Sequence, residues 1–589
     1  MNENENKQIQ LAHIRHSLAH LLGAAILELY PTAKLTLGPA IDNGFYYDAD
    51  IAEPVNEKDI IKIEQKMRQI AKTWAGFEKE IVSAENAKNK FSNNEYKHEL
   101  INGVVEKGEE ISLYTSGEFT DLCRGGHVES FKDIDMGGWK LDKIAGAYWR
   151  GDEKNKMLTR VYGLAFENKE ALANYELMII EAEKRDHRKL AKDLNLFTIS
   201  ELVGSGLPLW KPNGTVLRRM VTDFLWDLHK NRGYNWVTTP HLAKEALYET
   251  SGHAGHYMDD MFSVFGGTSQ EKFYVKPMNC PHHMQIFSSE NWSYRDMPVR
   301  YFEPAVVYRD EKTGQLSGLT RVRSITQDDG HLFCRVDQIG TEVKTIVDII
   351  KEFYTTMGLI DGYRVRLSLR DPENKQNYLG SDEVWQKSEQ ALTDICNDQK
   401  LPYFEGLGEA AFYGPKLDFM FKDAIGREHQ LATVQIDFNL PERFDLNYIN
   451  ETGAKERPVV IHRAIAGSLE RFLGVAIEHF AGAFPVWMAP VQIAVLPVSN
   501  EHHGEYAQKV FEDLRNAGIR AQLISDDSLG KRIRNTKMQK IPYQIIIGDK
   551  ERDSQTLTVE GRHDEKVENI TVNDFIARIQ NEIKDRTNN

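Results

Sequence analysis

The sequence predicts a multidomain protein of α+β and α/β type: an α+β domain, a helical connector, a large strand-rich domain and a small α/β domain. Three observations support this prediction. The chain has 589 residues, several times the roughly 150 residues of an average domain. A charge-rich helical pattern at residues 168–195 separates two regions rich in short strand patterns. From residue 488 on, apolar strand patterns alternate with helical ones, which is typical of a largely parallel sheet.

The elements follow in order. In the first domain, residues 1–167, apolar side chains at helical spacing predict a helix over residues 11–30, and one further helix is expected over residues 56–73 among short strands. The connector ends in a basic stretch. The large domain, residues 196–487, contains longer strand candidates such as RYFEPAVVY, VRLSL and RPVVI. The small domain covers residues 488–589.

Composition narrows the class of protein. The chain has 73 Lys and Arg residues and 88 Asp and Glu residues, which gives a net charge of −15. Any nucleic acid must therefore bind to local basic patches. The four cysteines are too scattered for a disulfide framework and suit a reducing compartment. No run reaches the roughly 18 apolar residues of a membrane span, and the polar start does not resemble a signal peptide. We expect a cytoplasmic protein without a membrane partner.

A first candidate site lies in the first domain. His16 and His20 are four residues apart, so a helix places both on one face, and the segment DLCRGGH supplies Cys123 and His127. Imidazole and thiolate groups suit zinc, and they equally suit general-base activation of water. Polar residues at a helix surface and a turn remain the third interpretation. A zinc peptidase is disfavoured because Ser17 stands where an HExxH helix carries glutamate.

A second candidate site lies in the large domain. Arg309 follows a strand pattern, and Arg321 and Arg323 begin the return segment, so three guanidinium groups could clamp phosphate or carboxylate. An exposed strand with solvated arginines is the alternative. Arg471 lies off the apolar stripe of a helix, beside small residues that let a flat ligand approach.

Cys280, His331 and His462 adjoin the segments of this second site. No spacing rule links residues so far apart, so the residues taken alone favour a structural role for each.

A series of motifs runs along the chain in one order: HSLAHLLG, GPAIDNGFYYD, DLCRGGHV, AGAYWRGD, KPMNCPHH, SGLTRVRSITQDDGHLFC, LGSDEVW, AFYGPK, TVQIDF and VIHRAIAGSLERF. This series resembles that of the threonyl-tRNA synthetases, a family of class II aminoacyl-tRNA synthetases, over essentially the whole length. The resemblance implies an editing domain, an antiparallel class II catalytic domain and a C-terminal α/β anticodon-binding domain, assembled as a homodimer. Residues 215–240 look like motif 1, the dimer element.

The resemblance also implies the reaction: ATP activates threonine as an adenylate, and threonine then passes to the 3′ end of tRNA(Thr). One Zn²⁺ per subunit and Mg²⁺ are the implied cofactors. A zinc ion with three protein ligands keeps a position open for the hydroxyl of threonine, which valine lacks. The implied zinc ligands are Cys280, His331 and His462; the implied catalytic residues are Arg309, Arg321, Arg471, Gln327, Asp329 and Lys416; and Met278, Tyr413, Gln430, Gln435 and Ser468 match positions that line the ATP and substrate pocket.

Serine keeps the hydroxyl, and a missing methyl is worth only about 1–3 kcal/mol, so a hydrolytic site for mischarged seryl-tRNA(Thr) is needed. In the family this site works without a metal. The resemblance assigns it to His16, His20, Tyr47, Lys97, Asp121, Cys123 and His127.

Some positions depart from the family pattern. We expect no counterpart of the N-terminal ubiquitin-like domain of many members, because the first matching helix begins near residue 11. His282 adds an imidazole next to the metal-site segment without an assignable role. Asp526 and Glu560 stand where relatives tend to carry Asn and Arg. The residues expected to contact tRNA are Lys531, Arg532, Arg534, Lys540 and Glu551, with a solvated basic face as the alternative.

Two other functions compete with a threonine-activating ligase. A synthetase-like paralogue could hold RNA without catalysis, but the residues matching zinc and ATP ligands are all present. A class II ligase for serine or proline is disfavoured by the three-ligand zinc set.

Overall fold

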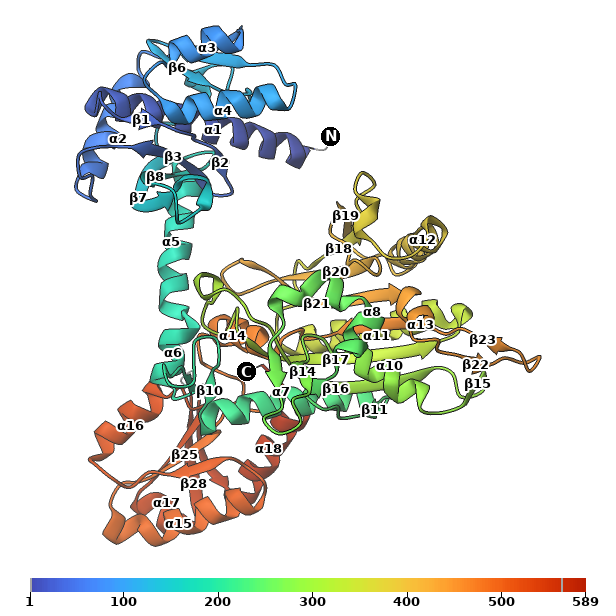
Figure 1. Cartoon of the computed structure of the whole chain (residues 1–589). Helices are drawn as coiled ribbons and strands as arrows, with labels where there is room; N and C mark the ends of the chain where they lie inside the picture. Colours follow the sequence, from blue (N-terminus) through green and yellow to red (C-terminus); the bar gives the residue numbers. More distant parts are fainter. Residues whose placement is uncertain (1–2, 563–564, 589) are drawn as a thin grey trace. The chain divides into compact units, whose positions relative to one another are not determined.

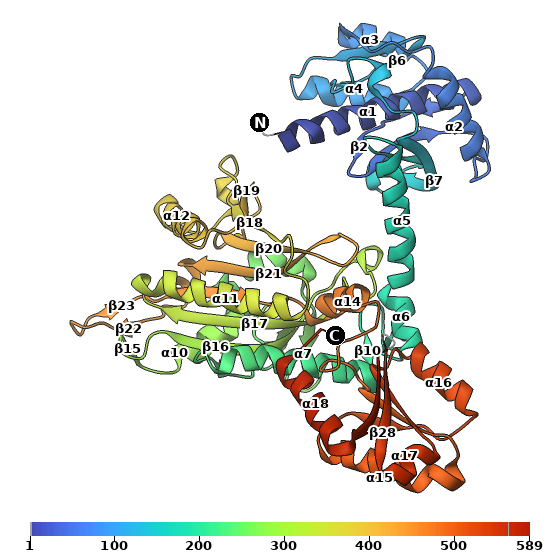
Figure 2. The same ribbon diagram turned by 180° about the vertical axis from the view of Figure 1, so that it is seen from behind.

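A computed structural model describes residues 3–562 and 565–588 of the chain, which Figures 1 and 2 show from opposite sides. The chain forms two compact units, Met1–Ile180 and Glu181–Asn589. The boundary falls inside helix α5 (Lys169–Arg185), in the segment predicted as a connector. The finer domain boundaries stay predictions.

The first unit combines helices with two antiparallel sheets. The main sheet has the order β1-β3-β8-β7 with β2 paired to β3, and the smaller one has the order β4-β5-β6. The strands are β1 (Lys34–Leu35), β2 (Ala40–Ile41), β3 (Gly44–Asp50), β4 (Glu78–Ile81), β5 (Ser112–Ser116), β6 (Phe119–Leu122), β7 (Trp139–Tyr148) and β8 (Met157–Ala165). The helices before α5 are α1 (Glu3–Leu29), α2 (Asp59–Ile70), α3 (Ala84–Lys90) and α4 (Glu95–Glu106).

Helix α1 is the central element of this unit. Leu18, Leu21 and Leu22 are fully buried, and the helix packs against α2 and β3 (Figure 1). Full burial of such side chains stabilises a fold by about 2 kcal/mol each. The packing fixes the orientation of the whole helix, including its histidines.

Helices α3 and α4 were not predicted, because neither has a long apolar stripe. Each begins at a side-chain cap: Ser83 Oγ accepts from the backbone N–H of Asn86 at 3.2 Å, and Asn94 Oδ1 accepts from that of Lys97 at 3.1 Å. Such caps satisfy backbone donors that the first turn leaves free.

The second unit is built around an eight-stranded sheet of order β11-β16-β17-β24-β21-β20-β18-β19. Neighbouring strands are antiparallel except for the parallel pairs at the two edges, which confirms the predicted antiparallel core. The strands are β11 (Asn235–Trp236), β16 (Val299–Tyr308), β17 (Ser324–Cys334), β18 (Arg364–Leu369), β19 (Tyr403–Leu407), β20 (Lys416–Lys422), β21 (Glu428–Asp437) and β24 (Val459–Ala464). Shorter peripheral strands are β9 (Phe197–Thr198), β10 (Leu209–Trp210), β12 (Leu242–Ala243), β13 (Ser263–Phe265), β14 (Lys272–Val275), β15 (Trp292–Ser293), β22 (Tyr448–Ile449) and β23 (Lys455–Glu456).

Helices close one face of this sheet and leave polar side chains on the other. Helix α11 (Ile339–Thr356) runs along β17 in Figure 2, and its Val343, Ile346 and Ile350 are fully buried. On the closed face Arg463 Nη1 donates to Asp328 Oδ1 at 2.8 Å, with both side chains buried. The other helices around the sheet are α6 (His187–Asp193), α7 (Pro212–Lys230), α8 (Glu245–Ser251), α9 (His253–Tyr257), α10 (Cys280–Ser288), α12 (Asp382–Asp398), α13 (Asn439–Arg443) and α14 (Leu469–His479).

The last part of the chain forms a five-stranded sheet of order β26-β25-β27-β28-β29. Only β25 pairs in parallel, with β26 and β27, so the largely parallel sheet predicted here is in fact mixed. Residues 548–555 between β27 and β28 are too few for a parallel crossover, which needs about a dozen. The elements are β25 (Ile493–Pro497), α15 (Asn500–Asn516), β26 (Ala521–Leu523), α16 (Leu529–Met538), β27 (Tyr543–Ile547), α17 (Asp549–Ser554), β28 (Thr556–Gly561), β29 (Lys566–Thr571) and α18 (Val572–Asp585).

Candidate functional site

A row of polar side chains crosses the open face of the eight-stranded sheet. His331 on β17 is paired with His462 on β24, which is paired with Gln435 on β21, and Gln435 is paired with Lys416 on β20. Directly paired residues point to the same face of a sheet, so these four side chains share one face. The strand register therefore brings together residues that lie far apart in sequence.

Cys280, at the first turn of α10, completes a cluster with the two histidines. One ligand atom from each of Cys280, His331 and His462 lies within 4.8 Å of the others, and all three residues are buried. His331 Nε2 and His462 Nδ1 are buried without a hydrogen-bond partner in the part of the chain that the structure describes. Buried polar atoms are nearly always paired, and a thiolate with two imidazoles is a common zinc donor set. The three residues therefore fit a zinc ion.

Asp437 orients one of the two histidines. Its Oδ2 accepts from His462 Nε2 at 2.9 Å, and its Oδ1 accepts from the backbone N–H groups of Asn439 and Leu440 at 2.7 and 3.0 Å. The proton on Nε2 leaves Nδ1 of His462 free to bind a metal. Asp437 is not among the residues predicted for this site, although it follows Gln435 at the strand interval of two.

Burial favours the neutral forms of the groups in this cluster. Burial, with the carboxylates of Asp329 and Asp437 nearby, raises the pKa of the Cys280 thiol, and burial lowers the pKa of His331. Burial also raises the pKa of Asp329. A bound cation favours the thiolate and the carboxylate, because its charge offsets the loss of hydration.

Two further predicted residues lie along β17. Gln327 and Asp329 precede His331 at intervals of two, so they share its face. Asp329 Oδ2 is a buried acceptor without a hydrogen-bond partner among the described residues. Gln327 forms an isolated bridge with Ser468, whose Oγ caps α14 by accepting from the backbone N–H of Arg471 at 3.3 Å.

The predicted arginines occupy different environments. Arg309 lies beside the Cys280 segment, where its Nη2 contacts Met278 Sδ at 3.0 Å. Arg471 is exposed in the first turn of α14. Arg321 is held by Glu311, with 2.8 Å from its Nε to the carboxylate, so its charge is already paired. No local pattern around Arg321 predicts that pairing.

The remaining pocket residues lie on β20, β21 and the loop before them. The Tyr413 ring lies 5.3 Å from that of His462, and Gln435 Nε2 donates to the carbonyl oxygen of Gly414 at 3.1 Å. Lys416 is ion-paired with Asp418. Gln430 Oε1 accepts from Arg366 Nη2 at 3.1 Å, because a register shift after Phe419 keeps Gln430 on the face of Lys416.

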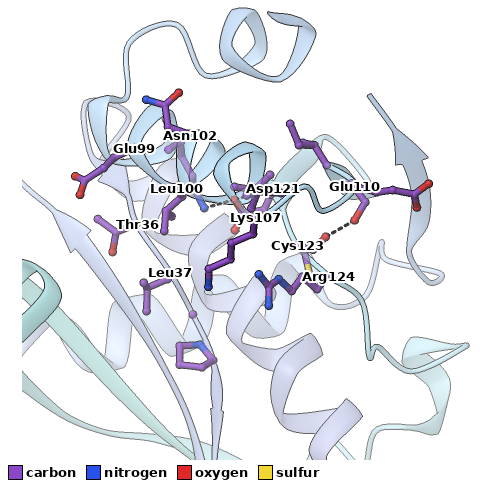
Figure 3. A pocket seen from close by; sticks show the side chains of 18 of the residues that line it. Thr36, Leu37, Glu99, Leu100, Asn102, Lys107, Glu110, Asp121, Cys123 and Arg124 are labelled. Carbon is purple, nitrogen blue, oxygen red and sulfur yellow. Dashed lines mark hydrogen bonds and ion pairs between the residues drawn. The ribbon is translucent and has the colours of Figure 1, made fainter. Parts of the chain in front are cut away.

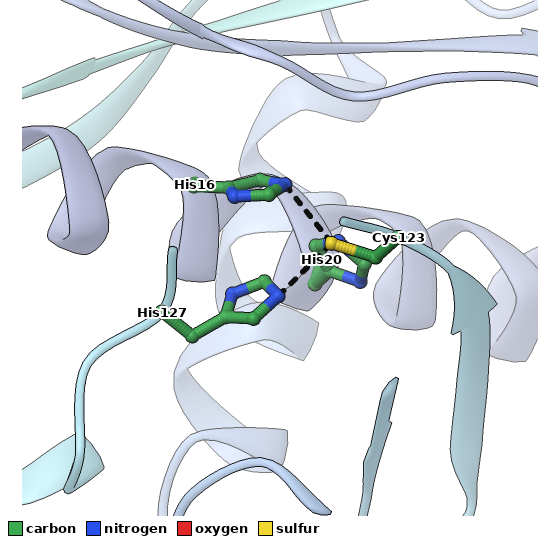
Figure 4. Close-up of side chains that lie close together, drawn as sticks. All are labelled: His16, His20, Cys123 and His127. Atoms are coloured by element: carbon green, nitrogen blue, oxygen red, sulfur yellow. Dashed lines mark hydrogen bonds between the residues drawn. The ribbon is translucent and has the colours of Figure 1, made fainter. Parts of the chain in front are cut away.

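The other predicted cluster forms in the first unit (Figure 4). One ligand atom from each of His16, His20, Cys123 and His127 lies within 4.8 Å of the others. Cys123 Sγ lies 3.2 Å from His127 Nε2 and 3.5 Å from His16 Nε2. Ser17 Oγ, which accepts from the backbone N–H of Val128 at 3.1 Å, also lies 3.4 Å from His127 Nδ1. The fold thus joins helix α1 to the loop after β6.

A buried polar group adjoins this cluster. Lys97 on α4 forms an ion pair with Asp121 on β6, and the hydroxyl of Tyr47 on β3 donates to the same carboxylate. His20 Nδ1 lies 3.9 Å from Asp121 Oδ2. The structure therefore brings all the predicted editing residues together.

Burial keeps the titratable groups of this cluster neutral. It lowers the pKa of His20 well below its ordinary value and, with the neighbouring histidines, lowers that of His127 to about 2. Burial raises the pKa of the Cys123 thiol to about 11. Neutral imidazoles can accept a proton from water, whereas a protonated thiol is a poor nucleophile.

A cavity of about 850 Å³ opens beside these residues. In Figure 3, Lys107 and Arg124 extend into the same space as Cys123. Basic and acidic side chains, among them Lys107 and Glu110, line this cavity together with His16, His20 and Cys123, and Arg124 is ion-paired with Glu109. A cavity that combines cations with acid–base groups suits a phosphate-bearing substrate with a reactive ester.

The basic residues of α16 differ in exposure. Lys531 and Arg534 are exposed, whereas Arg532 is buried and its Nη1 donates to the carbonyl oxygens of Pro497 and Ile524 at 2.7 and 3.0 Å. Arg532 thus has a structural role, contrary to its predicted contact with RNA. Lys540 donates to the carbonyl oxygen of Ala481.

Glu551, the acidic residue predicted to contact tRNA, is buried and caps α17, because its Oε2 accepts from the backbone N–H of Gly548 at 3.0 Å.

Among the described residues, no helix is long and apolar enough to cross a membrane.

Three family models match the chain. They are the tRNA synthetase class II core domain (G, H, P, S and T) at residues 264–480, the anticodon binding domain at residues 492–582, and the threonyl and alanyl tRNA synthetase second additional domain at residues 111–162. The first contains the Cys280 cluster and the third contains Cys123 and His127.

Close relatives match over nearly the whole chain. The threonine–tRNA ligase of Staphylococcus epidermidis is 46% identical over 97% of this chain and 88% of its own length, and that of Geobacillus sp. is 47% identical over the same shares. The solved RNA binding domain of threonyl-tRNA synthetase from Cryptosporidium parvum is 35% identical with a TM-score of 0.64, over 67% of this chain and 98% of that one. The chain belongs to the threonyl-tRNA synthetase family.

Proposed function

We propose that this protein activates threonine with ATP, transfers it to tRNA(Thr) in the second unit, and hydrolyses mischarged seryl-tRNA(Thr) in the first. The observation that carries the proposal is that Cys280, His331 and His462 come together on the open face of a class II sheet, where two ring nitrogens lack a hydrogen-bond partner in the described part of the chain. Family membership supports the same reaction.

In the ligase site, Cys280, His331 and His462 would hold Zn²⁺. When bound, this ion supplies an open coordination position that distinguishes threonine, with its hydroxyl, from valine. Asp329 has a buried carboxylate oxygen that lacks a hydrogen-bond partner among the described residues, and this oxygen suits the amino group of threonine. Arg309 and Arg471 would bind the phosphates of ATP, together with Mg²⁺, and offset the charge that develops on the α-phosphate.

In the editing site, the neutral histidines would position and activate a water molecule against the seryl ester, without a metal. The raised pKa of Cys123 supports a role as a hydrogen-bonding thiol. The volume of about 850 Å³ and the basic lining residue Lys107 suit the 3′ end of tRNA. Outside these two sites, Lys531 and Arg534 are exposed basic side chains on α16, and we expect them to contact phosphates of the tRNA.

The ligase assignment is tested by threonine-dependent exchange of pyrophosphate into ATP, with serine and valine in parallel. Cys280→Ala should lose bound zinc and exchange, whereas Cys396→Ala, a matched change at another buried cysteine, should keep both. Exchange by Cys280→Ala without metal refutes the ligand set. Absence of exchange in zinc-loaded wild-type protein points instead to an RNA-binding paralogue.

The editing assignment is tested by deacylation of seryl-tRNA(Thr). His20→Ala should abolish deacylation and leave pyrophosphate exchange intact. His98→Ala is the control, because His98 lies on α4 of the same unit, where its ring Nε2 contacts the carbonyl oxygen of Lys88. Unchanged deacylation in His20→Ala removes that residue from the site.

Metal analysis separates the two clusters. We expect one zinc per wild-type subunit and none in Cys280→Ala. If Cys280→Ala retains one equivalent that Cys123→Ala loses, the editing cluster holds the metal, and the metal-free mechanism is wrong.

We also propose a cytoplasmic homodimer formed through α7 and β11, the segment that resembles motif 1. Trp236 on β11 is 42% exposed in the isolated chain, which suits burial against a second copy. Light scattering of the purified protein checks the assembly state.

A further inference from the structure

A buried polar network lies behind the metal-site histidine His331. Lys276, Asn279, His283 and Glu303 are all buried, and they come from the segment before α10, from α10 itself and from β16. His283 Nδ1 lies 2.8 Å from His331 Nδ1, and His283 Nε2 lies 3.0 Å from Glu303 Oε2. His283 thus bridges a carboxylate and a candidate zinc ligand.

The hydrogen-bond donors around Glu303 determine the direction of these hydrogen bonds. Its carboxylate accepts from the backbone N–H of Thr239 at 2.8 Å and from Asn279 Nδ2 at 2.8 Å, and Lys276 Nζ lies 3.9 Å away. So many donors keep it ionised and therefore acceptor-only. His283 Nε2 lies 3.0 Å from both Glu303 Oε2 and Asn279 Nδ2. A lone pair on Nε2 would face the negative charge of Glu303, whereas Asn279 Nδ2 already has that carboxylate as its acceptor at 2.8 Å, so we assign the hydrogen to His283 Nε2, which donates to Glu303.

The direction of the hydrogen bond from His283 to Glu303 determines which ring nitrogen of His331 carries the hydrogen. Neutral His283 has its hydrogen on Nε2, so its Nδ1 is an acceptor, and the hydrogen between the two rings belongs to His331 Nδ1. His331 Nε2 then carries a lone pair, and this is the ring nitrogen without a partner among the described residues. The opposite direction would place a hydrogen on Nε2, where it would block a metal.

We propose that His283, held by Glu303, is a positioning residue that fixes His331 in the Nδ1–H tautomer and so presents its Nε2 to the metal. The proposal rests on the zinc site of the proposed function and adds a residue to it. The two histidine ligands are then oriented in different ways. Asp437 accepts a hydrogen bond from His462 directly, whereas Glu303 acts on His331 through a second imidazole, that of His283.

A competing arrangement uses the same atoms. His283, Asp329 and His331 also form a group whose ligand atoms lie within 4.8 Å of one another, so His283 could itself bind an ion. The two roles differ in what can replace the imidazole. A glutamine can accept from His331 and donate to Glu303, but it is a poor metal ligand beside thiolate and imidazole.

The adjacent histidine offers a matched control. His282 lies on the same helix and is also buried, yet both its ring nitrogens lack hydrogen-bond partners in residues 3–562 and 565–588. It is not part of either ligand group around His331. Substitutions at residues 282 and 283 therefore remove the same side chain from the same helix, with and without the contact to His331.

The test measures zinc affinity of the full-length protein by chelator competition, with thermal melting to confirm folding. His283→Met should bind zinc about 10- to 100-fold more weakly, the usual effect of removing a partner of a metal-bound histidine. His283→Gln should recover most of the affinity, and His282→Met should match wild type. Substituted Co²⁺ should keep its thiolate charge-transfer band in His283→Gln, because Cys280 remains a ligand.

Three results overturn the proposal. They are wild-type affinity in folded His283→Met, an equal loss in His282→Met, and a loss in His283→Gln as large as in His283→Met, which would make His283 a ligand. If His283→Met does not fold, His283→Asn takes its place, since the shorter amide cannot reach both partners. Wild-type protein that binds no zinc at all refutes the metal site itself, and the proposal falls with it.

Discussion

In the first unit, burial determines how much a single ion pair contributes to the free energy of unfolding. Lys97 and Asp121 form a pair whose side chains are only 2% and 4% exposed. Glu95, on the same helix α4, pairs with Lys34 at 2.7 Å, but these side chains are 59% and 39% exposed. Breaking a buried pair typically costs about 3–5 kcal/mol, because one charge stays behind unpaired, whereas an exposed pair is worth about 0–1 kcal/mol.

We therefore expect Lys97→Met to lower the free energy of unfolding of the first unit by about 3 kcal/mol. Lys34→Met, the matched change at the exposed pair, should lower it by less than about 1 kcal/mol. Urea unfolding of the full chain, followed by amide exchange in α1, measures both. Equal effects would contradict the burial argument.

The lowered pKa values of the editing histidines predict a pH dependence. A base with a lowered pKa stays neutral to a lower pH, although it is a weaker base, so burial of His20 and His127 keeps the neutral fraction of these imidazoles constant in mild acid. We expect seryl-tRNA(Thr) deacylation to change less than about twofold between pH 7.5 and 5.5. An imidazole of ordinary pKa near 6.5 would lose about tenfold over this range. A titration centred near pH 6.5 in the kcat/KM profile would show instead that the general base is a solvated histidine.

At the scale of elements, a single histidine joins three segments of the second unit. His187 lies at the start of α6. Its Nδ1 is 2.6 Å from Oε1 of Glu478 on α14, and its Nε2 accepts from the backbone N–H of Leu319 at 3.0 Å. Leu319 belongs to the loop between Arg309 and β17. A Cβ on Gly318 would lie 2.1 Å from the same imidazole, so the loop approaches it closely.

Removing this imidazole should loosen the loop that carries Arg321. His187→Ala leaves the Leu319 N–H without its acceptor, at a cost of about 1–3 kcal/mol for an unsatisfied buried group, while the Glu478 carboxylate keeps Arg427 and the backbone N–H of residue 187. We expect a higher KM for ATP in pyrophosphate exchange and a lower urea midpoint. His187→Gln should restore part of both. An unchanged KM for ATP with lowered stability would limit His187 to a structural role.

Element patterns were predictable where one face is buried and the other polar. Helix α1 and strands β16, β18 and β24 were recognised from their periodicity, because burial of one side imposes it. Helices α3 and α4 were missed, since caps such as Ser83 and Asn94 define them more than an apolar stripe does. The mixed sheet of the last part was missed because strand direction depends on connection length.

At the scale of the molecule, the two candidate sites lie in separate compact units. Cys280 belongs to the unit Glu181–Asn589 and His20 to the unit Met1–Ile180. Changes at distant sites without shared partners usually add.

The double variant Cys280→Ala/His20→Ala should therefore combine the single effects without interaction. We expect each change to affect only its own reaction: pyrophosphate exchange for Cys280→Ala and seryl-tRNA(Thr) deacylation for His20→Ala. Assays of the four proteins, wild type, both single variants and the double, measure this. Loss of deacylation in Cys280→Ala alone would reveal coupling between the units.

The sequence by itself determined the family, the antiparallel core, and which residues are available for chemistry, since motif order and periodicity are properties of the chain. Only the tertiary structure decided which of these residues meet. Strand register aligns His331 with His462, burial removes Arg532 from the surface, and Asp437, His283 and Glu303 set the protons of the cluster. The physical reason is that register, burial and hydrogen-bond direction depend on contacts between distant segments, which no local pattern records.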